Sequence, residues 1–161
     1  IDAQHLLFTG SGYSIKEIYT VEWVEGGGGG EKPVVFWEND GSYGAIEWNG
    51  TYRFALDGND GLNECIATFP ADVWNIIKTG TFYLEAKGSD WVQMRITDGW
   101  WSTTWTGSDI TTGDERIIDN GDGTYYIEIN FGDDPLVNVL DAQHLLFTGG
   151  GYTPLKLYYY E

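Results

Sequence analysis

The stretch DWVQMRIT, residues 90–97, places a core-forming side chain at every second position. A period of two is typical of a β-strand, because successive side chains point to opposite faces of the sheet. Val92, Met94 and Ile96 therefore share one face, which we expect to lie in a hydrophobic core. The residues between them must lie on the outer face.

The same period recurs in three further segments, separated by turns rich in Gly, Asp and Asn. These segments are residues 51–56, 81–87 and 124–131. Turn sequences lie at 57–61 and 119–123. Residues 71–78 alone have helical potential, and they amount to about two turns ended by Gly80. Short strands at this spacing predict an all-β fold, an antiparallel β-sandwich of the jelly-roll type.

A repeat gives the domain organisation. Residues 1–13, IDAQHLLFTGSGY, and 140–152, LDAQHLLFTGGGY, are identical at 11 of 13 positions, and a strand-like segment follows each copy. Residues 26–33 begin with five glycines and form a flexible linker by composition.

We therefore divide the chain into three parts: the closing strands of a preceding, similar module (1–25), the Gly-rich linker (26–33) and one complete β-sandwich module (34–161). A repeat within a single fold is the alternative. We expect residues 1–25 to add to an exposed β-edge of this module or of a neighbouring molecule. Exchange with the closing hairpin of residues 140–161 would give a domain-swapped dimer.

Charge limits the partners of this 161-residue chain. It carries 8 Lys and Arg against 25 Asp and Glu, a formal net charge of −17. Nucleic acid is disfavoured, because a phosphate backbone is bound by clustered Lys and Arg. Anionic membrane surfaces and acidic polysaccharides are disfavoured for the same reason. The 8 Trp, 11 Tyr and 7 Phe exclude a disordered chain, so a folded module with a neutral partner remains.

The outer face of residues 90–97 has the chemistry that a sugar ring requires. An indole face accepts the axial C–H patch of a pyranose, and Gln and Arg donate hydrogen bonds to its hydroxyls. Trp91, Gln93 and Arg95 supply these groups on one face. We expect Trp91 and Trp48 to be the main anchors and Gln93 to contribute less.

Other aromatic residues divide between core and surface. Trp37 and Trp74 lie among apolar neighbours and are predicted core residues. We expect Trp100 and Trp101 to point opposite ways, one into the core and one outward. The candidate carbohydrate-binding residues are Tyr43, Trp48, Trp91, Gln93, Arg95, Trp100, Trp101 and Trp105.

Several motifs together resemble a bacterial carbohydrate-binding module. They are a VxW-type opening strand, the segment Trp48-Asn49-Gly50, the alternating strand of residues 90–97 and the closing hairpin LLFTGGGY of residues 145–152. Such modules are attached to cellulases and related glycanases of gut and rumen anaerobes. The chain is similar to family 65, whose members bind xyloglucan and other β-1,4-linked glucans on a jelly roll.

The resemblance covers about residues 34–161. It implies a non-catalytic module that binds neutral plant cell-wall glycans (xyloglucan, mixed-linkage glucan, cellulose-like chains) in an open aromatic cleft and targets an attached glycoside hydrolase. The matching positions are Tyr43, Trp48, Trp91, Gln93 and Arg95. Tyr43 stands where the family has Trp, and Arg95 where a Gln is expected, so the preferred glycan stays open.

A compact jelly-roll glycoside hydrolase is the main alternative. It would need two carboxylates about 5 to 9.5 Å apart across the aromatic surface. The outward candidates Glu47, Glu85 and Glu128 lie on three separate strands, and the sequence pairs no two of them, so we expect no enzyme. A xylan- or mannan-binding module and a purely structural spacer are further alternatives, although a spacer gains nothing from an exposed Trp91.

We expect no cofactor. The turns at 57–61 and 119–123 resemble oxygen-ligand loops but lack the spacing of a calcium loop, so a structural calcium ion is the less favoured alternative. His5 and His144 are predicted to be structural, and the lone Cys65 excludes an intrachain disulfide. The sequence begins at Ile1 without a signal peptide, and we expect a piece of a longer secreted, extracellular protein, with a cell-surface location as the alternative.

Overall fold

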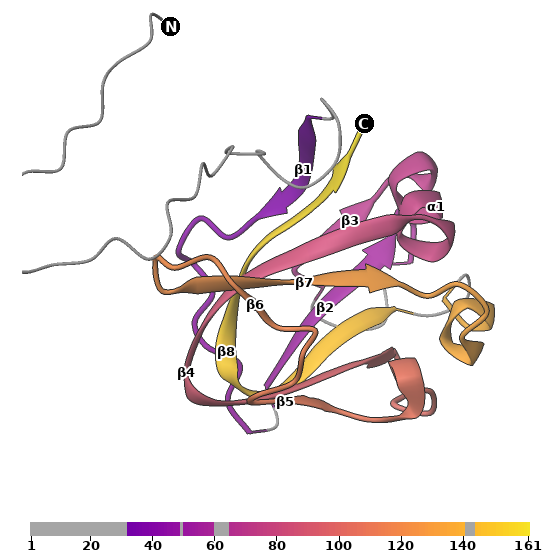
Figure 1. The fold of residues 1–161 in the computed structure, drawn as a ribbon. Helices are drawn as coiled ribbons and strands as arrows, with labels where there is room; N and C mark the ends of the chain where they lie inside the picture. The colour runs from indigo at the N-terminus through magenta and orange to yellow at the C-terminus, as the bar shows by residue number, and fades with distance from the viewer. Residues whose placement is uncertain (1–31, 49, 60–64, 141–143) are drawn as a thin grey trace, which may run out of the picture. The chain divides into compact units, whose positions relative to one another are not determined.

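The computed structural model describes residues 32–48, 50–59, 65–140 and 144–161 (Figure 1). The predicted closing strands of a preceding module, residues 1–25, lie outside these residues. The described part starts beside its own C-terminus, because the backbone N–H of Lys32 donates to the carbonyl of Glu161 at 3.1 Å.

Eight strands and one α-helix make up the described part of the chain. In order they are β1 (Pro33–Glu38), β2 (Gly50–Leu56), β3 (Ala67–Phe69), α1 (Ala71–Thr79), β4 (Thr81–Asp98), β5 (Ile110–Thr111), β6 (Ile118–Asp119), β7 (Thr124–Asn130) and β8 (Leu145–Tyr160). Two short 3-10 helices, η2 (Trp105–Gly107) and η3 (Pro135–Asn138), lie in the connections. The predicted helix over residues 71–78 is confirmed.

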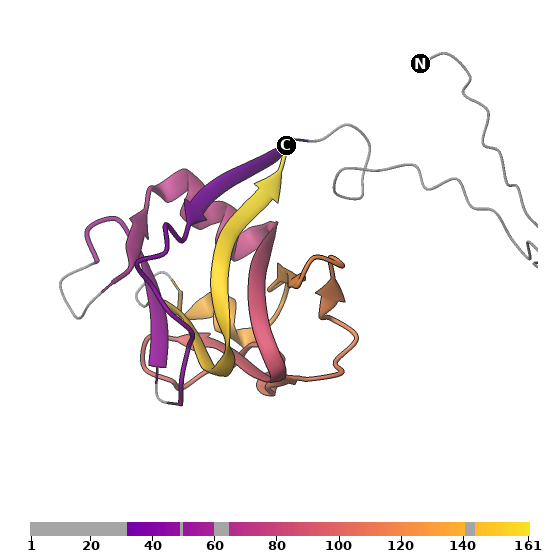
Figure 2. The same ribbon diagram turned by 90° about the vertical axis from the view of Figure 1, so that its left-hand side faces the viewer.

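Two long, bent strands build both layers of the fold. The first half of β4 pairs with β7, and its second half pairs with β5. Likewise, the start of β8 pairs with β2 and its end pairs with β1. Both strands turn at the left of Figure 1, and Figure 2 shows β8 between β4 on one side and β1 and β2 on the other. The open sheet folds over its own core, which confirms the predicted all-β sandwich.

Residues 81–87 and 90–97, expected as separate segments, belong to the single strand β4. The strand changes register between Gly88 and Gln93, where its two halves meet. A Cβ at Gly88 would lie 2.9 Å from the hydroxyl of Tyr125 and 3.0 Å from Cγ2 of Val92, so a larger residue there would crowd these two side chains. The continuity explains how one strand presents an outer face on both layers.

The predicted core faces are confirmed. Side chains of alternate residues along β4 are buried: Phe82, Leu84, Ala86, Val92, Met94 and Ile96. Trp37 and Trp74 belong to the same buried cluster, as expected. The side chains between these β4 residues therefore point out of the sandwich.

One strand pair differs from the expected antiparallel arrangement. β3 runs parallel to β2, with Phe54 opposite Ala67. Ala67–Phe69 pairs with Phe54–Leu56, so β3 runs alongside the last three residues of β2. No helix in the described ranges is long and apolar enough to cross a membrane.

Candidate functional site

The outer face of the second half of β4 carries the side chains that the sequence places there. Trp91 is 53% exposed, Arg95 is exposed and Gln93 is half-buried. They alternate with the buried residues Val92 and Met94, so the strand pleat alone orients them. The predicted outward triplet is confirmed in its direction.

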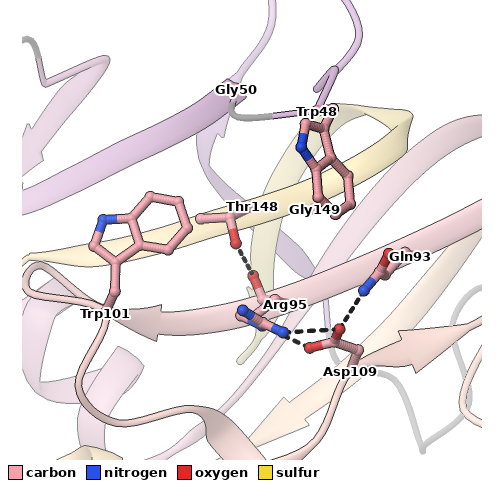
Figure 3. Close-up of a pocket in the computed structure, with 8 residues that line it drawn as sticks. All are labelled: Trp48, Gly50, Gln93, Arg95, Trp101, Asp109, Thr148 and Gly149. Atoms are coloured by element: carbon pink, nitrogen blue, oxygen red, sulfur yellow. Dashed lines mark hydrogen bonds and ion pairs between the residues drawn. The ribbon is translucent and has the colours of Figure 1, made fainter.

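A shallow groove lies over this face and is lined by residues from five parts of the chain (Figure 3). Its volume is about 120 Å³. Pockets that enclose a small molecule are usually ~300 Å³ or larger, so the groove suits a ligand that lies on the surface. We call it the Trp groove, and its lining residues are Trp48, Gly50, Gln93, Arg95, Trp101, Asp109, Thr148 and Gly149.

Two exposed indoles border the Trp groove. Trp48, just before β2, is 73% exposed, and Trp101, in the turn after β4, is 48% exposed. In Figure 3 they stand on either side of Thr148. The Thr148 hydroxyl donates a hydrogen bond to the backbone carbonyl of Arg95 at 3.4 Å. The side chain of Thr148, from β8, therefore closes the groove between the two indoles.

A charged, hydrogen-bonded cluster forms one wall of the groove. Asp109 Oδ1 accepts from Arg95 Nε at 2.6 Å, and Asp109 Oδ2 accepts from Arg95 Nη2 at 3.0 Å and from Gln93 Nε2. The hydrogen bonds from Arg95, with that from Gln93, hold the pKa of Asp109 below its usual range. Both partners are charged at neutral pH, and the pair adds no net charge to the groove.

Sequence reasoning missed Asp109. It lies in an irregular connection 14 residues after Arg95, and nothing in its immediate neighbourhood marks it. The link between them is the two-residue strand β5, which pairs Gln93 with Thr111 and Met94 with Ile110. Continuing this register brings Asp109 opposite Arg95, so the site follows once β5 is recognised.

The Trp100–Trp101 pair corrects a prediction, since both indoles are exposed and neither enters the core. Strand alternation does not apply because both residues lie in a turn, and Trp101 has a positive φ of 60°. The buried carboxylate of Asp98 holds this turn. It accepts from the backbone N–H groups of Trp100 (3.1 Å), Ser102 (2.8 Å) and Thr103 (2.7 Å).

Asp98 keeps its charge in this buried position. Burial acts to raise its pKa, but the hydrogen bonds from Thr103, Ser102 and Trp100 outweigh burial and lower the pKa below its ordinary value. A charged acceptor bonded to three amides fixes the turn strongly. The position of the Trp101 indole therefore depends on a carboxylate inside the sandwich.

Trp105 was a candidate binding residue, and the structure places it in the core instead. It is only 8% exposed and meets Phe131 edge to face, with 5.9 Å between the ring centroids. The guanidinium carbon of Arg116 (Cζ) lies 5.9 Å from the centroid of the same indole. The 3-10 helix η2 turns the ring inward, and no spacing in the sequence predicts that turn.

Tyr43 is exposed but does not line the Trp groove. Its ring packs against that of Tyr52, with 5.7 Å between the ring centroids. Tyr43 also borders a second hollow together with Cys65 and Ile66. Asn39 holds the loop through bonds to the backbone of Tyr43. The structure thus brings together Trp48, Gln93, Arg95 and Trp101, and it leaves Tyr43 outside this set.

Trp91 lies next to the Trp groove without lining it. Its indole rests on β8, where a Cβ at Gly150 would come within 3.3 Å of the indole Cζ3. Glycine at 150 therefore gives the ring a flat backbone to lie on. The exposed indole continues the outer face of β4 beyond Gln93.

A second aromatic surface, unpredicted from the sequence, covers the outer face of the other layer. We call it the Tyr face: Tyr83 of β4, Tyr126 of β7, and Tyr158 and Tyr160 of β8. Tyr83 stacks on Tyr158 with centroids 5.2 Å apart and meets Tyr160 edge to face at 5.2 Å. Burial, and then the nearby Glu128 carboxylate, raise the pKa of Tyr83 to about 12.

The three outward glutamates can now be placed. Glu85 and Glu128 share the Tyr face as diagonal neighbours, since Glu85 pairs with Tyr126 and Tyr83 pairs with Glu128. Glu85 lies 3.5 Å from Lys156 Nζ, and Glu128 accepts a hydrogen bond from Tyr83 at 3.2 Å. Glu47 is exposed beside Trp48. Neither glutamate of the Tyr face has the unpartnered, apolar setting that a general acid needs.

The aspartates of the turn at 119–123 have local hydrogen-bond partners, and the turn at 57–61 lies partly outside the described residues. Asp119 and Asp122 accept hydrogen bonds from Gly121 and Thr124, as turn-forming aspartates do. In the ranges that the structure describes, no three His, Cys, Asp or Glu side chains gather in a metal-binding group. His144 is buried, between Arg53 Nη1 at 2.7 Å and the Asn59 carbonyl at 2.6 Å, which fits the predicted structural role.

Comparison of the chain with protein-family models, with curated proteins and with solved structures finds no match.

Proposed function

We propose that the chain is a non-catalytic module that binds internal stretches of a neutral β-1,4-linked glycan in the Trp groove. The observation that carries this proposal is the pair of exposed indoles, Trp48 and Trp101, in one groove with the polar side chains of Gln93, Arg95 and Asp109. Sugar rings present C–H patches to indoles and hydroxyls to polar side chains, and the groove offers both.

The shape and charge of the groove favour a polymer without charge. A hollow of about 120 Å³ is well below the ~300 Å³ of the pockets that usually enclose a small ligand, whereas a chain can lie across it and extend past both indoles. Trp91, on the same outer face, lies where a longer ligand would continue. The net charge of −17 repels polyanions at a distance, and neutral chains escape that repulsion.

The carboxylates support binding rather than hydrolysis. The lining of the Trp groove includes a single carboxylate, that of Asp109, and Arg95 occupies both of its oxygens. Hydrolysis of a glycosidic bond usually needs two carboxyl groups on either side of the bond. The other pair, Glu85 and Glu128, lies on the Tyr face, which belongs to the other layer.

As the wider role, we propose that the module holds an attached, secreted glycanase against plant cell walls. This part of the proposal is supported by the resemblance of the sequence to family 65 carbohydrate-binding modules. Glucan and xylan chains differ in their twist, and the angle between the Trp48 and Trp101 rings would select between them.

Affinity gel electrophoresis against xyloglucan, barley β-glucan, glucomannan and xylan tests the proposal. We expect retardation by at least one of the glucans and no release of reducing sugar from any polymer. Retardation by none of them would overturn the proposed ligand. Release of reducing sugar by the purified chain would overturn the non-catalytic role.

A further inference from the structure

Asp109 occupies the part of Arg95 that recognises carboxylates. A guanidinium presents parallel N–H groups that match the two oxygens of a carboxylate, and such bidentate pairs are the strongest contacts Arg makes. In the Trp groove, Arg95 Nε and Nη2 already face Asp109 Oδ1 and Oδ2 at 2.6 and 3.0 Å. An internal carboxylate thus holds the place that a ligand carboxylate would take.

Hydrogen-bonding capacity remains after this pairing. Arg95 has five N–H donors and uses two of them on Asp109, so three are left for a ligand. Gln93 donates one of its two N–H groups to Asp109 and keeps its carbonyl oxygen as an acceptor. The cluster can therefore serve hydroxyl groups while presenting no net charge.

We propose that Asp109 sets the ligand class of the Trp groove, by neutralising Arg95 so that the groove accepts neutral glycans and discriminates against glycans that carry carboxylates. The inference rests on the proposed function and adds a specificity-determining residue to it. Removing the Asp109 charge leaves Arg95 as a lone cation in the groove, and this cation should attract a polymer carboxylate.

The chain contains a matched control. Asp114 pairs with Arg116 in the same bidentate way, with Arg116 Nε at 2.8 Å from Oδ1 and Nη2 at 2.6 Å from Oδ2. Neither residue lines the Trp groove. Asp114→Asn therefore changes the net charge by the same amount as Asp109→Asn and leaves the groove untouched.

The experiment compares the wild-type chain, Asp109→Asn and Asp114→Asn on two polymers with one backbone. Hydroxyethyl cellulose is neutral, and carboxymethyl cellulose carries carboxylates on the same β-1,4-glucan. We expect Asp109→Asn to gain about two- to fivefold in affinity for carboxymethyl cellulose at low salt. The gain should fade at high salt because the new interaction is electrostatic. Asp114→Asn should match the wild type.

Each outcome bears on a different claim. No gain for Asp109→Asn, or an equal gain for Asp114→Asn, overturns the inference, since only net charge would then matter. A wild-type chain that binds no neutral glucan overturns the proposed function instead. Circular dichroism checks the fold, and if Asp109→Asn does not fold, Asp109→Ser removes the same charge and carries the same expectation.

Discussion

The Trp groove and the Tyr face are both aromatic outer surfaces, and they use their rings in opposite ways. On the Tyr face, Tyr83, Tyr126, Tyr158 and Tyr160 are half-buried and contact one another, with centroids between 5.2 and 6.1 Å apart. In the groove, Trp48 and Trp101 are far more exposed, and within the described part of the chain neither packs against another ring.

The two surfaces differ in how much of each ring face is left uncovered by other side chains. Rings that stack on each other have already buried part of their faces, so they contribute to folding. Rings held apart around a polar cluster leave their faces open, and open indole faces next to hydrogen-bonding groups are what a sugar needs. An exposed aromatic residue therefore indicates a binding site only when its neighbours are polar and its ring faces are free.

The largest effect should come from Trp48→Ala, which we expect to weaken glycan binding more than tenfold. The fold should be unaffected, because the side chain is 73% exposed. Tyr158→Ala should do the reverse, costing about 1–3 kcal/mol of stability through lost ring contacts while binding is unchanged. Titration calorimetry and thermal unfolding measure the two quantities on the same samples.

Equal losses of binding in both variants would show that the Tyr face also contributes to the site. Retention of full affinity by Trp48→Ala would remove the central anchor of the proposal.

The next effect should come from Asp98→Ala, which removes the acceptor that holds the Trp100–Trp101 turn. Loss of a buried charged acceptor should lower the free energy of unfolding by about 2 kcal/mol or more. Glycan affinity should fall as well, because Trp101 loses its fixed position. Asp133→Ala is the control, since Asp133 is exposed in a turn. Unfolding in urea measures stability, and a groove that keeps full affinity without Asp98 would contradict the role given to Trp101.

The two surfaces should also respond to opposite ends of the pH scale. The hydrogen bonds from Arg95 lower the pKa of Asp109, so the stabilising ion pair between the two is fully present above the ordinary pKa of 3.8. The ion pair is lost as the pH falls through the lowered pKa. Because this carboxylate holds Arg95 and Gln93 in the Trp groove, glycan binding should stay constant from about pH 7 to 5 and weaken only in stronger acid.

On the Tyr face the sign is reversed. The pKa of Tyr83 is raised from 10.0 to about 12, so stability is fully present below pH 10.0 and is lost as the pH rises towards 12. Melting temperature and tyrosinate absorbance followed against pH test this. Ionisation of every tyrosine near pH 10.0 would contradict the packing of the Tyr face.

Periodicity predicted the parts of this molecule in which local pattern and tertiary environment agree. The alternation of residues 90–97 gave the core side chains and the outward triplet, and both are confirmed. The pattern failed where the chain leaves a strand. Trp100 and Trp101 sit in a turn held by Asp98, and Trp105 is turned inward by η2.

Asp109 and the Tyr face were missed for a different reason. Asp109 meets Arg95 only through the register of a two-residue strand, and such a strand leaves no periodic signal. The tyrosines come from three strands, and their meeting depends on which strands are neighbours, since β4 lies between β7 and β8. Strand order and register are properties of the whole sheet, so they cannot be read from one segment at a time.

The smallest effect, no loss of binding, is expected when the chain begins at Lys32. The described module closes there, because Lys32 and Glu161 exchange backbone hydrogen bonds at 3.1 and 3.2 Å and β1 pairs along the end of β8. Every lining residue of the Trp groove comes later, from Trp48 onward. A chain that begins at Asn39 is the matched control, and it should lose stability because it lacks β1 and the buried Trp37. Calorimetry with the preferred glycan compares the three lengths. If the chain beginning at Lys32 folds but binds more weakly, residues 1–25 contribute to the site, and the division into remnant, linker and module is wrong.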